Sequence, residues 1–520
     1  MANKIVIDPV TRIEGHLRIE VEVENGVVKD AWSSGTMARG FEAMLIGRQP
    51  MDAIYVTERS CGVCTLVHGL CSSRTLDMAY GCKVPEAGIL LRNLMLAALH
   101  MGDHIQIFYN LNAPDYIDIT AVAGYKGNDP KLLAIKDKIV ALVKANDTSP
   151  FTPTYKNDQY TLTDPEIVTT LVHHYLQAIE ARAIAQKCIA IFGGKSPHQA
   201  GVIQGGVTYH PNLEDLVKYK EYIAKVIDFV QNVYWKDILF LGSGPLLPVG
   251  QAGLGGGYNN YLSGPEFPLD NSGKDFLWKG GVVTDGNLGA VQPLDGQKIA
   301  ESVAHSWYDY SNNQPLLQPF EGETKFNLKK EGAYSFLKAP RYDGKPYEVG
   351  PLAWAMTVQP KEFMDIVTKL NIKPGFLARH AARAYQAVDV SKNVMKWVDQ
   401  LASLMGKGPL IVNDDKPTPD NARGFGFVEA PRGFLSHWAI IEGKKLKNYQ
   451  QVVPTTWNAS PRDANNVRGQ YEQSLIGIPV PDPENPINVV RNIRSFDPCL
   501  ACAVHIIHPE SNRILKFVVE

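Results

Sequence analysis

Two Cys-x-x-Cys pairs lie near opposite ends of the chain. Cys61 and Cys64 form the first pair, and Cys499 and Cys502 form the second, more than four hundred residues later. Cysteines three positions apart place both sulfur atoms on one side of a turn, so each pair can chelate a soft metal ion as thiolates. If the fold brings the pairs together, they form a site with four thiolate ligands.

The spacing alone leaves two other interpretations open. A structural zinc site is the most common fate of two such pairs, but zinc ribbons usually separate them by roughly fifteen to twenty residues. A chain of 520 residues can bury a large core without a metal to hold it together. A redox dithiol of the thioredoxin type would use one pair and leave the other without a role.

The other cysteines give no second site. The chain has seven cysteines, an odd number, which argues against a disulfide framework. Cys71, Cys82 and Cys188 have no partner at metal-ligand spacing, so we expect each to be a small buried apolar residue.

Composition excludes several classes of partner. A net charge of -2 provides no basic surplus for a phosphate backbone, so no nucleic acid is expected. The longest uncharged stretch, 238–265, is interrupted by Gly and Pro and is predicted to be loop rather than a transmembrane span. Asp8 and Glu14 lie where a signal peptide needs an apolar core, so we expect that this chain does not direct its own export.

The elements that must position the cysteines are predicted to form one α+β body over residues 1–505, with a large helical core. Residues 4–7 and 17–23 alternate as strands, and Asn25-Gly26 is a hairpin signal. The segment 239–351 is rich in Gly, Pro and aromatic residues and is predicted to contain further short strands. Apolar residues at helical spacing predict helices over 85–111, 164–191, 213–233, 297–311, 360–370 and 380–404.

The residues flanking the cysteine pairs add a resemblance. Residues 59–68 (RSCGVCTLVH) and 497–505 (DPCLACAVH) resemble the two signature motifs of the large, catalytic subunit of [NiFe] hydrogenases, R-x-C-G-x-C-x-x-x-H and D-P-C-x-x-C-x-x-H. Seven further blocks follow in the family's order and cover essentially the whole chain: RIEGH (12–16), RGFE (39–42), FGGKSPH (192–198), HSWY (305–308), VGPLA (349–353), APRG (430–433) and VPTTWN (453–458).

This resemblance implies a nickel-iron centre and the family's fold, which the complex I-type subunit shares. Cys61 and Cys499 would be terminal nickel ligands, whereas Cys64 and Cys502 would bridge nickel to an iron that also carries cyanide and carbon monoxide. The activity implied is reversible heterolytic cleavage of H2 into protons and electrons.

The resemblance also assigns the residues that handle charge and protons. Cys499 is the first choice for the base, because a metal-bound thiolate is already deprotonated. Glu14 matches the carboxylate that takes the proton onward. Arg432 would orient and stabilise charge at the same position, with Asp103 and Asp497 as the carboxylates around it.

Other residues would surround the metals. His68 would hydrogen-bond a bridging sulfur, while Pro431, Thr455 and backbone groups near Val453 would face the diatomic ligands.

A magnesium site is implied at some distance from the cysteines. Its ligands would be Glu42, the carbonyl of Gln451 and His505, although histidine is an unusual ligand for that hard ion.

The chain continues beyond the second motif, which is where the mature large subunit of this family ends. Residues 506–520 would then be a precursor extension that a maturation endopeptidase removes by cutting between His505 and Ile506. We expect an iron-sulfur small subunit to carry electrons away, because this chain has no further cysteine cluster. Export with that partner favours the periplasmic side of the membrane, and the cytoplasm is the alternative.

Two rival functions make different predictions. A non-hydrogenase relative acting as a structural or coupling module lacks the paired cysteines that are present here. A four-cysteine scaffold predicts zinc in place of nickel.

Overall fold

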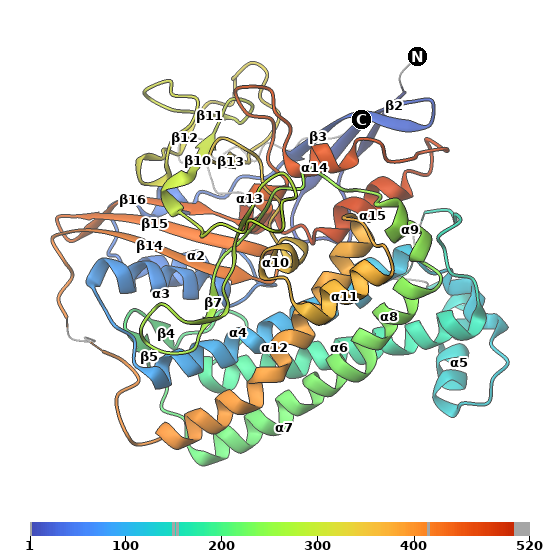
Figure 1. The fold of residues 1–520 in the computed structure, drawn as a ribbon, viewed down its shortest axis with the longest axis horizontal. Helices are drawn as coiled ribbons and strands as arrows, with labels where there is room; N and C mark the ends of the chain where they lie inside the picture. Colours follow the sequence, from blue (N-terminus) through green and yellow to red (C-terminus); the bar gives the residue numbers. More distant parts are fainter. Residues whose placement is uncertain (1–2, 148–150, 152–154, 413–415, 504–520) are drawn as a thin grey trace.

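The computed structural model describes residues 3–147, 151, 155–412 and 416–503. Long helices fill the lower half of the molecule as drawn in Figure 1. They are α4 (Glu86–Gln106), α5 (Pro130–Lys144), α6 (Pro165–Gly193), α7 (Leu213–Phe229), α8 (Trp235–Ser243) and α12 (Phe376–Leu404). Short helical turns extend or connect them: η1 (Ile107–Asn112), η2 (Ala113–Asp115), η3 (Ile119–Gly124) and η4 (Val230–Tyr234).

The sequence explains where these helices start and how they pack. Asp164 caps α6 by accepting hydrogen bonds from the N–H groups of Glu166 and Ile167, and Pro165 occupies the first helical position. Helix α4 is buried along nearly its whole length, as expected of a helix that is apolar on most faces. Helices α6 and α12 pack against it and surround it with the other members of the bundle.

Most helix predictions are confirmed. The predicted segments 85–111, 164–191, 213–233, 360–370 and 380–404 correspond to α4, α6, α7, α11 (Lys361–Lys369) and α12. The stretch 238–265 is only partly loop, because α8 and α9 (Leu247–Ala252) occupy its first half.

The helix predicted over 297–311 is wrong. This segment contains η5 (Gly296–Lys298), β10 (Ile299–Ser302) and β11 (Tyr308–Asp309). Strand β10 pairs with β13 (Ala339–Tyr342), and β11 pairs with β12 (Lys325–Phe326). Pairing with distant strands overrides the local helical spacing, as is common for short strands.

The N-terminal sheet is confirmed and lies against the last helices that the structure describes. Strands β1 (Asn3–Ile7), β2 (Leu17–Glu24) and β3 (Val27–Gly35) are antiparallel, with a turn at Asn25 and Gly26. Alternate residues of β2 are buried, which fits a sheet with one covered face. Its core is shared with α14 (Gln470–Leu475), α15 (Ile487–Ser495) and α16 (Leu500–Ala503). Figure 1 accordingly shows the blue strands beside the red helices.

A second antiparallel sheet was not predicted. It consists of β14 (Asn421–Ala430), β15 (Gly433–Glu442) and β16 (Lys445–Val452), and α3 (Val67–Tyr80) packs on it. Helices α1 (Phe41–Leu45) and α2 (Asp52–Glu58) precede α3, and the first cysteine pair lies in the turn between α2 and α3. The cysteines therefore lie between this sheet and the helical bundle.

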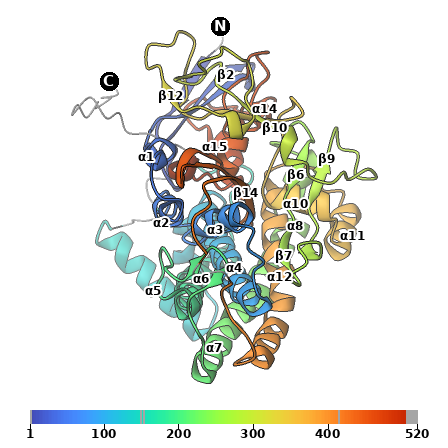
Figure 2. The ribbon, with the colours of Figure 1, turned by 90° about the vertical axis from the view of Figure 1, so that its left-hand side faces the viewer.

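The segment 239–351 contains short strands, as predicted. Besides β10 to β13 these are β6 (Tyr261–Ser263), β7 (Glu266–Pro268), β8 (Phe276–Trp278) and β9 (Gly281–Val283). Two more short strands, β4 (Val202–Ile203) and β5 (Gly206–Val207), lie before this segment and were not predicted. The remaining helical elements are η6 (Pro319–Glu321), α10 (Pro351–Val358) and α13 (Pro454–Asn458). In the second view, the N-terminal sheet and α7 lie at opposite ends of the molecule (Figure 2).

The fold is of the predicted mixed α+β type. In the part of the chain that the structure describes, no helix is long and apolar enough to cross a membrane.

Candidate metal centre

The two cysteine pairs meet, as the sequence predicted. The Sγ atoms of Cys61, Cys64, Cys499 and Cys502 all lie within 4.8 Å of one another, and all four side chains are buried. The Sγ atoms of Cys64 and Cys502 are 3.0 Å apart, and those of Cys61 and Cys499 are 3.4 Å apart. These two contacts join the first pair to the second, and within the second pair the Sγ atoms of Cys499 and Cys502 are 2.9 Å apart.

Backbone contacts hold the two pairs in place. The N–H groups of Val63 and Cys64 donate to Cys61 Sγ at 3.2 and 3.4 Å, so the backbone of the first pair turns around the Cys61 sulfur. The Cys499 N–H donates to Thr455 Oγ1 at 3.0 Å. Glu14 forms a parallel bridge with Cys499. This bridge ties the start of the chain to the second pair.

Gly15 allows that bridge to form. Its φ of +82° lies in the left-handed region that favours glycine. A Cβ atom at this position would lie 2.5 Å from the backbone nitrogen of Ala501. The glycine in the RIEGH block therefore lets the N-terminal segment contact α16 directly.

The four sulfur atoms cannot all be thiolates without a cation. Burial raises the pKa of Cys499 and of Cys502 well above the usual range of a thiol. Hydrogen bonds from neighbouring thiols instead lower the pKa of Cys61. A buried cluster of negative sulfurs needs positive charge beside it, and soft divalent metals are the cations that thiolates prefer. The donor set therefore fits a soft metal centre.

Glu14 contacts the second pair directly. Its Oε2 atom lies 3.2 Å from Cys499 Sγ and accepts the N–H of Ala501 at 2.9 Å. Burial, and secondarily the negative charge of Cys61, raise the pKa of Glu14. A carboxyl group with a raised pKa next to a sulfur is suited to accept a proton and pass it on.

Arg432 and the two predicted carboxylates also come together. Arg432 Nη2 lies 3.0 Å from Asp497 Oδ1, and Arg432 Nη1 lies 3.5 Å from Asp103 Oδ2. All three side chains are buried. The pKa of Asp103 is raised to about 6 by burial, against the opposing effects of Arg182 and Arg432.

A small cavity lies beside the cysteines. Its lining includes the predicted residues His68, Pro431, Val453 and Thr455, together with Cys64, Cys499 and Cys502. These four predicted residues therefore share one small cavity with three of the four cysteines. His68 Nδ1 lies 3.1 Å from His437 Nε2, a hydrogen-bonding neighbour that the sequence did not suggest.

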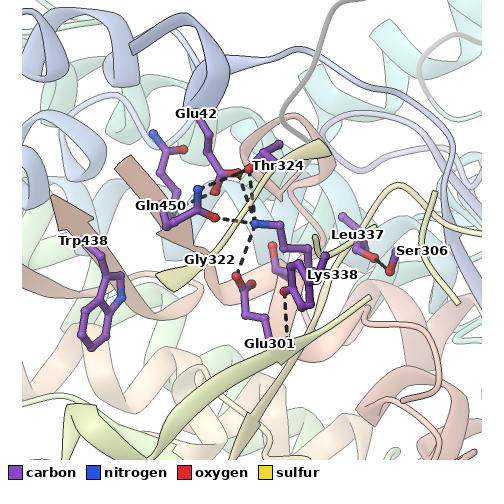
Figure 3. Close-up of polar contacts among 12 residues, drawn as sticks. Glu42, Glu301, Ser306, Gly322, Thr324, Leu337, Lys338, Trp438 and Gln450 are labelled. Atoms are coloured by element: carbon purple, nitrogen blue, oxygen red, sulfur yellow. Dashed lines mark hydrogen bonds and ion pairs between the residues drawn. The ribbon is translucent and has the colours of Figure 1, made fainter. Parts of the chain in front are cut away.

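Glu42 lies in a separate buried cluster (Figure 3). Its Oε1 atom accepts the N–H of Gln451 at 2.9 Å, so two of the three predicted magnesium ligands are neighbours. The third, His505, lies outside the described residues. Glu42 Oε2 is 3.3 Å from the ammonium of Lys338 and also accepts the hydroxyl of Thr324.

This cluster contains two carboxyl groups and one ammonium. Lys338 Nζ is also 3.6 Å from Glu301 Oε2 and 2.5 Å from Gln450 Oε1. Burial raises the pKa of Glu301 to about 7. The Lys338 ammonium is thus the shared partner of two buried carboxyl groups, Glu42 and Glu301. A hard cation would balance the remaining negative charge when both are ionised.

Comparison with known proteins agrees with this geometry. Residues 39–505 match the family model described as nickel-dependent hydrogenase, and residues 4–33 match one described as HoxL-like. The chain belongs to the nickel-dependent hydrogenase family. Its fold and its four-cysteine centre are those expected of the family's catalytic large subunit, an oxidoreductase that acts on H2.

Individual relatives match over their full length. The chain is 38% identical to the hydrogenase-2 large chain of Escherichia coli K12, with all of both chains covered. It is 39% identical to the periplasmic [NiFeSe] hydrogenase large subunit of Desulfomicrobium baculatum, over 98% of this chain and 96% of that protein. A solved structure of the D. baculatum [NiFeSe] hydrogenase superposes with a TM-score of 0.85 at 39% identity, covering 97% of this chain and 100% of that one.

Three residues near the cysteines were given no role from the sequence. Arg39 donates to the carbonyls of Arg59 and Ser60, and to that of Ala501 at 3.3 Å, so it bridges both cysteine segments. His198 Nε2 lies 3.0 Å from the carbonyl oxygen of Cys61. Arg39 and His198 belong to the RGFE and FGGKSPH motifs, so the motif resemblance could have pointed to them. Arg182, which pairs with Asp103, belongs to none of the motifs.

Proposed function

We propose that this chain is the catalytic subunit of a [NiFe] hydrogenase and that it cleaves H2 heterolytically at the four-cysteine centre. The observation that carries the proposal is the contact between Cys499 Sγ and Glu14 Oε2 at 3.2 Å. This contact places a proton acceptor against one sulfur of a soft-metal site, whereas a structural zinc site needs no such acceptor.

The four sulfurs would hold nickel and an iron with cyanide and carbon monoxide ligands. Cys61 and Cys499 would bind nickel terminally, and Cys64 and Cys502 would bridge the two metals. When bound, the centre supplies the Lewis acid that polarises H2 and the redox couple that accepts its electrons. Pro431, Val453 and the Thr455 hydroxyl would face the diatomic ligands, and His68 would hydrogen-bond a bridging sulfur.

The chain's own residues would move the proton. Cys499 Sγ would receive it and pass it to Glu14 Oε2 over the short contact described above. Arg432 remains a cation throughout, because a guanidinium cannot act as a base near neutral pH. Its role would be to stabilise negative charge over the cysteines, while Asp103 and Asp497 hold it in position.

A magnesium ion would occupy the Glu42 cluster. Glu42 and the carbonyl of Gln451 would be ligands, and His505 would be the third. The excess of buried carboxylate over ammonium supports this assignment.

We also propose an iron-sulfur small subunit as the electron-transfer partner, and an endopeptidase that removes residues 506–520 after His505. The relatives compared above are a large chain and a large subunit, and the latter is named as periplasmic. These names favour the periplasmic side of the membrane for this chain, with the cytoplasm as the alternative.

The decisive experiment is infrared spectroscopy of the chain purified without oxygen, after co-expression with its small subunit and maturation proteins. We expect nickel and iron in the protein, strong bands from metal-bound cyanide and carbon monoxide, and H2-dependent reduction of a viologen dye. Zinc in place of nickel, with neither bands nor dye reduction, would show that the four-thiolate scaffold is the correct interpretation. Cys499→Ser is the matched inactive variant, and it should abolish dye reduction.

A further inference from the structure

Arg182 connects the bundle helix α6 to the region of the cysteines. Its Nη2 atom is 2.7 Å from Asp103 Oδ1 and donates to the carbonyl oxygen of Val63 at 3.0 Å. Its Nε atom donates to Gln106 Oε1 at 2.9 Å. Val63 lies between Cys61 and Cys64, so a single guanidinium contacts both the cysteine loop and helix α4.

The packing of the two helices makes room for this side chain. Gly102 lies on α4 directly before Asp103, and a Cβ atom there would lie 2.7 Å from the Ala185 Cβ and 3.4 Å from the Arg182 Cδ. Any larger residue at this position would push α6 and the arginine away. The guanidinium is also nearly enclosed, with a side-chain exposure of 12%.

Asp103 lies between two guanidinium groups. Arg182 approaches one carboxylate oxygen at 2.7 Å, and Arg432 approaches the other at 3.5 Å. Arg432 is held on its other side by Asp497 at 3.0 Å. The result is a buried row of alternating charge in the order Arg182, Asp103, Arg432, Asp497.

The geometry of this row makes the position of Arg432 depend on Arg182. If Arg182 were replaced by a neutral residue, Asp103 would lose the nearer of its two cations and would keep Arg432, which lies at 3.5 Å. A buried carboxylate is costly to keep charged with fewer cations beside it, so Asp103 would draw Arg432 closer or take up a proton. Either change alters the charge that Arg432 presents to the cysteines.

We infer that Arg182 is a positioning residue for the reaction: it holds Arg432 over the cysteines through Asp103, and Val63 and Gln106 hold Arg182 in turn. This inference rests on the role proposed above for Arg432. It assigns a function to a residue that lies outside the motif blocks on which the family resemblance was based.

The test uses Arg182→Gln and Arg182→Lys in the assembled heterodimer loaded with metal. The measurements are nickel content, melting temperature, kcat per nickel, KM for H2 and the infrared bands of the diatomic ligands. We expect Arg182→Gln to lower kcat about ten- to a hundredfold, the size of effect caused by misplacing an orienting group by about 1 Å. The infrared bands should shift while nickel content is retained. Arg182→Lys keeps the charge but loses the planar fork, so it should recover part of the lost activity.

Arg92→Lys is the matched control. Arg92 is a buried arginine on α4, the helix that carries Asp103, and it pairs with Asp77 at 2.6 Å and donates to the carbonyl of Ile203. It is not part of the metal centre. We expect this variant to change the melting temperature only, with unchanged kcat per nickel and unchanged bands.

A double-variant cycle separates this inference from the proposed function. If Arg182 acts through Asp103, adding Arg182→Gln to Asp103→Asn should cause little further loss of kcat. A full additional loss, or an Arg182→Gln variant that behaves like Arg92→Lys, would overturn the inference. Arg432→Lys tests the role proposed for Arg432. If this variant is fully active, that role is wrong. If Arg432→Lys loses most of its kcat while Arg182→Gln is normal, only the role of Arg182 is refuted.

Discussion

At the scale of single residues, the centre combines groups that shift one another's protonation. Glu14 contacts Cys499 Sγ and is bonded by the N–H of Ala501, and its pKa is raised chiefly by burial. The same burial raises the pKa of Cys499. When both the carboxyl group and the neighbouring thiol have raised pKa values, neither stays permanently charged. A proton can then pass between them.

Glu14→Gln should separate proton transfer from metal assembly. Glutamine has nearly the same shape and can still accept the N–H of Ala501 through its amide oxygen, but it cannot carry a proton onward. We expect exchange of H2 with deuterated water to fall about a hundredfold or more, with nickel content unchanged. Glu20→Gln, at a carboxylate on strand β2 paired with Lys4, is the control and should leave exchange unchanged. Equal exchange in the Glu14→Gln and Glu20→Gln variants would mean that the proton leaves by another route.

The residue types at the centre could be read from the sequence, but their partners could not. The cysteines, Glu14 and Arg432 stand in distinctive blocks, and the structure brings them together. Arg182 and Lys338 stand outside all of these blocks, and each acquires its role only from a contact with a residue far along the chain. Spacing within a motif carries no information about such contacts.

At the scale of elements, helices were easier to predict than strands for a physical reason. A helix such as α12 is specified by its own apolar spacing, whereas a strand needs a partner that the local sequence does not name. The helix predicted over 297–311 was wrong for this reason, since β10 pairs with β13 about forty residues away. The sheet β14 to β16 was missed on the same grounds, although it carries Arg432 in its first turn.

The contact between the N-terminal segment and α16 gives a prediction about assembly. Gly15→Ala should place a methyl group against the Ala501 nitrogen and displace the second cysteine pair. We expect lower nickel content and a lower melting temperature. Gly47→Ala is the matched control, because Gly47 has a similar φ of +80° but open space around its Cβ position. That variant should lose only the backbone term of about 1–2 kcal/mol and keep its nickel. Full nickel content in Gly15→Ala would show that this close approach is not required for metal binding.

At the scale of the whole molecule, the centre joins the two ends of the chain. The N-terminal segment, the turn before α3 and the start of α16 all contribute, so the site exists only when the sheets and the bundle are assembled. A metal that binds only this arrangement stabilises the whole fold by mass action. The motif resemblance predicted which residues form the site. It could not predict the burial that shifts their pKa values, because that burial arises only when the whole molecule has folded.

The Glu42 cluster should make global stability depend on pH when divalent cations are removed. The pKa of Glu301 rises from its ordinary value of 4.5 to about 7 on folding, because burial and the negative charge of Glu42 outweigh the opposing effect of Lys338. Between these two values the folded protein holds a proton that the unfolded chain has released. The contribution of Glu301 is therefore fully present below about pH 4.5 and is lost as the pH rises through about 7. The loss amounts to about 3 kcal/mol at most.

Glu301→Gln stays neutral at every pH and should lack this loss. We expect the free energy of unfolding of the chelated wild-type protein to fall more steeply between pH 5 and pH 8 than that of Glu301→Gln, measured by denaturant titration. Added Mg²⁺ should reduce the difference, because a cation in the cluster stabilises the charged carboxylates. Parallel pH profiles for the two proteins, with and without Mg²⁺, would show that Glu301 does not change its charge on folding in this pH range and that no cation binds beside it. The cluster would then be a structural ion-pair network and not a cation site.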